Sequence, residues 1–428
     1  MNNLPLHQIG ELGPIAFLVS SVIKILFAFT AVMITVAMLT LLERKISAWM
    51  QDRKGPNRVG PGGLLQPAAD GVKNILKEET NPSEAHPVFF ILAPMLAIIP
   101  ALVTFAVIPF AAPLPTPWGL VPMVVADLPI GILFLLAFSS LGVYGIVLAG
   151  WASSNKYALL GGLRAGAQMI SYEITLGLSL LSVFFLVGNV ALTEVVWTQQ
   201  RILWFALPLA VSFLFFWISA FAETNRLPFD LPEAESELVT GYHTEYSSMK
   251  FSMFFIAEYA HVLTISALMA TLFLGGWDIP LWQGDNMVAR GGAVLGASPA
   301  WWITLLTFGA FILKTAFFIL IFMLVRWTVP RFRYDQVMDL GWKVMLPSAL
   351  GAVVVTAATI LALDSAGVQE GVVYGLVLTV VNVAMLLVVV MIMDRGRILE
   401  GTGTLDARRQ IAVDKARRRR MEIQIAGD

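Results

Sequence analysis

Long apolar stretches alternate with shorter polar segments along almost the whole chain. Nine of these stretches are long enough to cross the roughly 30 Å hydrocarbon core of a bilayer as α-helices. They cover residues 15–42, 88–111, 128–150, 157–189, 202–222, 251–275, 302–326, 344–363 and 371–393. The pattern predicts an all-α fold, a polytopic transmembrane helix bundle of about nine spans.

The basic residues predict how this bundle is oriented. If the nine spans alternate in direction, 24 of the 28 lysines and arginines fall on one side and only Arg201 and Arg290 fall on the other. Lys24 and Lys314 lie within spans. Because basic residues accumulate on the inner side of membranes, we expect the N-terminus outside and the C-terminus inside.

Composition supports a membrane protein and excludes several kinds of site. The chain is 57% hydrophobic and 13% charged, whereas soluble domains carry about 25% charged residues. It contains no cysteine, so it has no thiolate ligand for an iron–sulfur cluster and no disulfide. If the protein serves a redox reaction, another chain carries the electrons.

Residues 223–250 form an acidic loop with six carboxylates and two bases. The acids are Glu223, Asp230, Glu233, Glu235, Glu237 and Glu245, and the bases are Arg226 and Lys250. One interpretation is a solvated acidic loop. The apolar residues among the acids, such as Phe229 and Leu231, favour partial burial instead. Burial raises and couples carboxylate pKa values, which indicates a proton-handling site.

Several ionisable side chains lie inside the predicted spans, where charge is costly. Glu173, Glu258 and Lys314 are either ion-paired residues that hold helices together or members of a proton relay, and Lys24 can reach the outer interface. Glu258 and His261 are three residues apart and share a helix face. A di-iron bundle needs a second Glu-x-x-His and two further glutamates, so we expect no metal.

Two other segments have recognisable patterns. Residues 64–78 place their apolar side chains on one face, which predicts a helix that lies in the membrane interface. The glycine-rich residues 55–63 lack the Gly-Lys-Ser/Thr of a phosphate loop, and we interpret them as a tight turn. We find no nucleotide motif and expect no nucleic-acid partner.

Two loops carry a specific resemblance. The sequence ERKISAWMQDRKGPNRVGPGGLLQPAADGVK at 43–73 and the sequence AETNRLPFDLPEAESELVTGYHTEY at 222–246 resemble the NADH dehydrogenase subunit 1 family. In bacteria this family supplies the H-type membrane subunit of the proton-pumping NADH:quinone oxidoreductase, respiratory complex I. Residues 150–173 and 326–336 are similar to the same family, and the resemblance covers roughly residues 15–350.

The resemblance implies a function in quinone reduction. It implies a membrane subunit that forms much of the quinone-binding chamber and couples quinone reduction to proton translocation, in the bacterial cytoplasmic (inner) membrane. The relay or catalytic positions it implies are Glu173, Glu223, Arg226, Glu233, Glu235, Glu237, Glu245 and Glu258. Positions near the quinone chamber or its entrance would be Arg44, Asp70 and Arg226.

The resemblance also implies cofactors and partners. Quinone would be the substrate, while NADH, FMN and iron–sulfur clusters would be bound by partner subunits, and this chain would bind no cofactor itself. The expected partners are the quinone-site subunits of the peripheral arm, neighbouring small membrane subunits and the lipid bilayer.

The chain departs from the family at its C-terminal end. We expect three parts: the family's eight-helix module at 1–363, an additional ninth helix at 364–394 and a basic cytoplasmic tail at 395–428. Two alternatives stay open. One is a subunit of a membrane-bound hydrogenase or related dehydrogenase that shares the module. The other is an autonomous ion transporter, although we find none of the inverted repeats typical of transporters.

Overall fold

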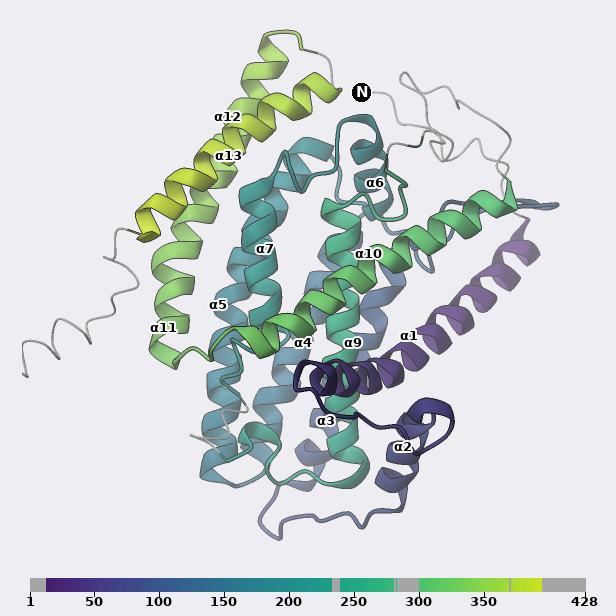
Figure 1. The fold of residues 1–428 in the computed structure, drawn as a ribbon, viewed down its shortest axis with the longest axis vertical. Coiled ribbons are helices and arrows are strands. Elements are labelled where there is room, and N and C mark those ends of the chain that lie inside the picture. Colours follow the sequence, from purple (N-terminus) through teal and green to yellow (C-terminus); the bar gives the residue numbers. More distant parts are fainter. Residues whose placement is uncertain (1–12, 233–238, 281, 283–299, 369–370, 395–428) are drawn as a thin grey trace, which may run out of the picture.

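The computed structural model describes residues 13–232, 239–280, 282, 300–368 and 371–394. Helices account for nearly all regular structure in this part of the chain (Figure 1). The long helices are α1 (Pro14–Met50), α3 (Pro87–Val103), α4 (Gly131–Ala152), α5 (Lys156–Val187), α9 (Ser248–Phe273), α10 (Trp301–Thr328), α12 (Leu346–Ser365) and α13 (Val372–Asp394). This confirms the predicted all-α polytopic bundle.

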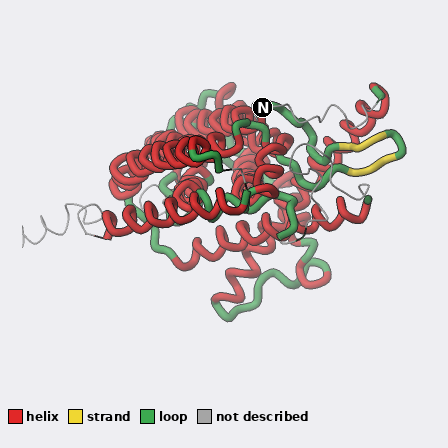
Figure 2. The backbone as a smooth tube through the Cα atoms, turned by 90° about the horizontal axis from the view of Figure 1, so that it is seen from above, coloured by secondary structure: helices red, strands yellow, loops and turns green. Residues whose placement is uncertain are grey.

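Shorter elements connect these helices. They are α2 (Gln66–Leu76), α6 (Leu192–Arg201), α7 (Ala210–Glu223), α11 (Tyr334–Asp339) and the 3-10 turns Pro61–Gly63, Thr104–Val107 and Gly241–His243. Strands β1 (Leu114–Thr116) and β2 (Gly119–Val121) pair as an antiparallel hairpin, which projects from one side of the bundle (Figure 2).

Eight helices in the described part of the chain are long and apolar enough to cross a membrane. The fifth predicted span, at 202–222, corresponds to α7, which is a 14-residue apolar helix. Helix α7 is shorter than the ~20 residues of a full crossing because residues 202–209 form turns before it rather than helix. Figure 1 shows α1 and α10 running obliquely across the more upright α5, α7 and α9.

Local signals in the sequence set the ends of α5. Asn155 accepts a hydrogen bond from the backbone N–H of Tyr157 at 2.9 Å, as an N-cap does. Gly188 ends the helix in the left-handed conformation, with φ of 71°, which glycine adopts without steric cost. The 32 residues between them carry Gln168, Tyr172 and Glu173 into the interior of the bundle.

Helices α11 and α12 form one continuous helix that contains a π-helical turn at Leu340–Met345. This helix is held on α5, since the hydroxyl of Tyr172 donates to the carbonyl of Val337 at 2.9 Å. The indole N–H of Trp342 donates to Ser171 Oγ at 3.1 Å. Wider turns of this kind often occur at functional positions.

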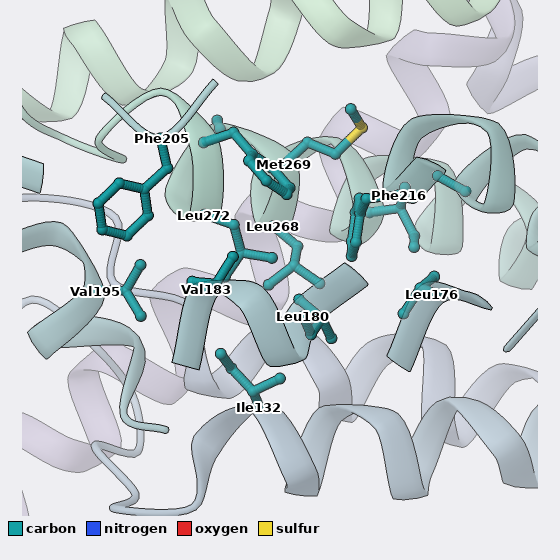
Figure 3. Close-up of a cluster of buried hydrophobic side chains, with 14 of the residues drawn as sticks. Ile132, Leu176, Leu180, Val183, Val195, Phe205, Phe216, Leu268, Met269 and Leu272 are labelled. Atoms are coloured by element: carbon teal, nitrogen blue, oxygen red, sulfur yellow. The ribbon is translucent and has the colours of Figure 1, made fainter. Parts of the chain in front are cut away.

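Helix α9 is the most buried of the eight long helices, since 72% of the residues in its most apolar 18-residue segment are buried. One apolar cluster packs α9 against α4, α5, α6 and α7. The residues of this cluster that Figure 3 labels point toward one another. A second cluster packs the other end of α9 against α1, α3 and α4. Polar side chains buried on α9 are therefore fixed by neighbours on every side.

Candidate functional site

The loop that follows α7 is held in place by Gln168, a fully buried residue of α5. Its side-chain amide donates to the carbonyls of Ala222 at 2.7 Å and Phe229 at 2.8 Å. These two carbonyls lie before and after Arg226 in the chain. The bonds therefore fix the segment that carries Arg226 and aim it toward the interior.

Arg226 joins carboxylates from two different helices. Its Nη1 lies 3.1 Å from Glu43 Oε2 on α1, and its Nε lies 2.7 Å from Glu258 Oε1 on α9. The guanidinium also lies over the ring of Tyr259, 4.3 Å from its centroid. A planar guanidinium suits this arrangement because it can meet two acceptors and an aromatic face together.

Glu43 has two further partners. The hydroxyl of Tyr259 donates to Glu43 Oε2 at 2.7 Å, and Arg326 Nη1 of α10 pairs with Glu43 Oε1. Two acids and two arginines thus offset each other in charge, which is the condition for stable burial of ionised groups. We call Glu43, Arg226, Glu258 and Arg326 the charge cluster.

The charge cluster lies between two hollows. The first, the basic groove, has a volume of about 590 Å³ and is lined by Glu43, Arg44, Arg53, Lys54, Tyr259 and Arg326 among others. The second, the acidic cavity, is much smaller, with a volume of about 60 Å³, and Glu223, Glu258 and His261 are in its wall. Because Arg226 binds Glu43 and Glu258, it links the wall of one hollow to the wall of the other.

Inside the acidic cavity, Glu223 and His261 form a second close pair. His261 Nε2 lies 3.5 Å from Glu223 Oε1, and the hydroxyl of Ser139 donates to the same oxygen. On the next residue of α4, the hydroxyl of Ser140 donates to Glu173 on α5. Two consecutive serines of α4 therefore each bind one acid, Ser139 that of α7 and Ser140 that of α5.

Groups outside the spans have shifted pKa values. Burial opposes the charged form of Arg226, but the carboxylates of Glu258 and Glu43 outweigh it and raise the pKa of Arg226. Burial raises the pKa of Asp230 above its ordinary value, against the opposing effect of Arg331 at 2.7 Å. Burial lowers the pKa of His243 to about 4, so its imidazole is neutral at pH 7.

The other predicted residues lie in different places. Asn155 Nδ2 donates to Glu245 at 2.6 Å, which ties Glu245 to the start of α5. Arg44 pairs with Asp70 of α2 at 2.7 Å, and Arg44 lines the basic groove. Three predicted acids lie outside the described residues, and they are Glu233, Glu235 and Glu237.

Seven residues of the site were not among the predicted site residues. They are Glu43, Ser139, Ser140, Gln168, Tyr259, His261 and Arg326. Glu43 and Arg326 begin two of the segments that carried the family resemblance, and His261 stood out only for its spacing from Glu258. Gln168 is one of several polar residues in an apolar stretch, and its two closest partners are backbone carbonyls, which side-chain patterns do not reveal.

Within the described ranges, no three histidine, aspartate or glutamate side chains come close enough to hold a metal ion. The charged groups of the site instead pair with each other and with hydroxyls. Such an arrangement has groups that can bind and release protons and that can orient polar groups of a ligand.

Comparison with known proteins identifies the family. A family model described as NADH dehydrogenase matches residues 23–357. The chain belongs to the NADH dehydrogenase family. This confirms the resemblance that the two loop sequences indicated.

Individual members of the NADH dehydrogenase family match over nearly their whole length. One H-type subunit of the NADH-quinone oxidoreductase of Geobacter metallireducens is 47% identical over 354 residues, which cover 80% of this chain and 96% of that protein. The corresponding H-type subunit of Rhodospirillum centenum is 49% identical over 343 residues, covering 80% and 94%. That of Paramagnetospirillum magneticum is 48% identical, covering 82% and 96%. Helix α13 begins after the residues that the family model matches.

Proposed function

We propose that this chain is the H-type membrane subunit of a bacterial NADH:quinone oxidoreductase, an enzyme complex in the cytoplasmic membrane. In this role the chain forms much of the chamber for the quinone headgroup and couples quinone reduction to proton translocation. NADH, FMN and the iron–sulfur clusters would belong to partner subunits, and the absence of cysteine leaves this chain without a thiolate ligand for a cluster. The names of its relatives support the assignment.

The observation that carries the proposal is the charge cluster between the basic groove and the acidic cavity. A quinone that accepts two electrons also takes up two protons or becomes negatively charged. A negative headgroup beside the groove would be stabilised by Arg44 and Arg326 and would compete for the arginine that neutralises Glu43. Weaker pairing of Glu43 would alter the charge balance on Arg226 and, through it, on Glu258.

The acids beyond the charge cluster provide the route onward. Glu258, His261 and Glu223 line one cavity, and the adjacent residues Ser139 and Ser140 of α4 donate to Glu223 and to Glu173, respectively. We propose that protonation changes pass along this series toward the pumping subunits. Glu245 and the acids at 233–237 would face the same chamber from the loop, and Arg44 and Asp70 would border its entrance.

The test is to isolate the intact complex through this chain and identify its copurifying subunits by mass spectrometry. The proposal expects flavin and iron–sulfur subunits together with NADH:quinone turnover. Subunits of a hydrogenase in place of a flavoprotein NADH dehydrogenase would contradict it. Proton flux through the isolated chain in liposomes would contradict it also, because it would support an autonomous transporter.

A further inference from the structure

His261 lies between the charge cluster and Glu223. It follows Glu258 by one helical turn on α9, so the two side chains share a face, and both line the acidic cavity. Glu258 is held by Arg226, whereas His261 Nε2 lies 3.5 Å from Glu223. The imidazole therefore lies in the cavity wall that Glu258 of the charge cluster and Glu223 share.

We propose that His261 is a proton-relay residue that carries protons between Glu258 and Glu223. The inference rests on the proposed function, since it assigns one transfer step within the same site. Imidazole is suited to this step because one ring nitrogen can accept a proton while the other releases one.

The step conserves charge inside the bundle. A protonated Glu258 gives its proton to the free ring nitrogen of a neutral imidazole, which leaves a Glu258 carboxylate facing Arg226 and an imidazolium facing the ionised Glu223. The second transfer breaks the N–H bond at Nε2 and forms an O–H bond on Glu223, which leaves a neutral imidazole and a carboxylic acid. The total charge of the three groups is the same before and after each transfer, and the imidazolium is never without a carboxylate partner, whose absence would be costly.

The surroundings of His261 leave few other groups for its proton. Glu223 faces it from α7 and Glu258 from its own helix, while Ser139 of α4 donates to Glu223. The remaining wall of the cavity is formed by apolar residues of α3, α4 and α9, by Thr104, by Met169 of α5, by Thr224 and Asn225 after α7, and by Tyr242. Glu173 is not part of this wall and binds Ser140, the residue after Ser139.

The experiment uses the intact complex with His261→Asn, which keeps a polar side chain but does not titrate. NADH:quinone turnover and proton pumping are measured between about pH 5.5 and 9, and NADH oxidation by an artificial acceptor reports the amount of assembled enzyme. We expect unchanged artificial-acceptor activity. Coupled turnover at pH 7 should fall by about a hundredfold, the lower end for a positioned acid–base group, and the pH profile of coupled turnover should differ from that of the wild type.

Two further variants make the test specific. In the double variant His261→Asn/Glu223→Gln, the loss of coupled turnover should be no greater than in the more impaired single variant. The reason is that the effects of mutating residues that act as one unit do not add. His86→Asn is the matched control. His86 stacks near Trp151 outside the cavity, and this variant should behave as wild type.

Each outcome decides the question. Unchanged turnover in His261→Asn would overturn the relay assignment. Reduced turnover with an unaltered pH profile would overturn it as well, because that result is expected of a structural residue. If Glu258→Gln impairs coupled turnover while His261→Asn does not, the proposed function stands and this inference fails. If both variants turn over and pump like the wild type, the proposed coupling route fails as well.

Discussion

Arg226 pairs with Glu258 at 2.7 Å, across the junction between the loop that follows α7 and the buried face of α9. The same guanidinium contacts Glu43 at 3.1 Å from the opposite direction. One base in the acidic loop thus serves two acids from separate helices. Its removal would leave two buried carboxylates with less compensation, so changes at Arg226 affect both fold and function.

Arg226→Lys should assemble but lose coupled activity. An ammonium cannot meet two carboxylates in the fixed geometry of a guanidinium, so quinone turnover should fall while artificial-acceptor activity remains. Arg226→Ala should also reduce assembly, because breaking a buried pair costs about 3–5 kcal/mol. Native gels measure assembly, and assays with quinone and with the artificial acceptor measure the two activities. Arg331→Lys is the control, since Arg331 makes one partly exposed pair with Asp230. Wild-type turnover in Arg226→Lys would contradict the prediction.

Glu258→Gln should lower quinone turnover and proton pumping together. Glutamine keeps the size of glutamate and can accept the hydrogen bond from Arg226, but it does not titrate and therefore removes a relay step. Loss of the charge opposite Arg226 would instead lower the amount of assembled complex. Glu258→Asp should retain more of both activities, and Glu173→Gln should have a weaker effect because Glu173 lies further along the series. Rates are compared per assembled complex. Full pumping by Glu258→Gln would leave Glu258 with a structural role in the charge cluster.

The sequence predicted the helical bundle well because the fold depends on the lengths of apolar segments, which are local. The ends of the helices were harder to predict from the sequence. Residues 202–209 are as apolar as a span but form turns, since their packing against α9 decides their conformation. Helix α2 at Gln66–Leu76 agrees closely with the amphipathic segment predicted at 64–78, because its pattern follows one helical period.

The site was only partly predictable. Arg226 was identified from its place among acids within one loop. Its partner Glu43 lies 183 residues away in the chain, and Arg326 lies 283 residues from Glu43. Periodicity describes neighbours along a helix and carries no information about which helices meet. Long-range pairing of this kind therefore required the folded structure.

His243 should make stability depend on pH. Burial lowers the pKa of its imidazole from 6.5 to about 4, so the unfolded chain binds a proton at a higher pH than the folded one does. Stability is therefore highest above about pH 6.5 and falls as pH decreases from there toward 4. His243→Phe, which keeps the aromatic contacts with Tyr242 and Phe251, should flatten this slope. The thermal midpoint of the complex at several pH values measures it, and an equal slope in both proteins would contradict the assignment.

Lys314 should support the fold rather than the relay. Its ammonium donates to the carbonyls of Leu274 at 2.6 Å and Gly276 at 3.1 Å and to that of Asp278, where the C-terminus of α9 leaves carbonyls without helical partners. The positive charge is also favourable at this end of the helix dipole. Lys314 thereby anchors α10 to the end of α9, away from the charge cluster.

Lys314→Met should therefore destabilise the bundle by about 1–3 kcal/mol, the cost of leaving buried acceptors unsatisfied. The thermal midpoint of the purified complex should decrease, while coupled turnover per intact complex stays at the wild-type level. Lys343→Met is the matched control. Lys343 is exposed and pairs only with Asp339 one turn away, a contact worth about 0.3–0.5 kcal/mol, so its midpoint should barely change. If Lys314→Met kept its stability but pumped fewer protons per quinone, Lys314 would belong to the relay and not to the anchor of α9.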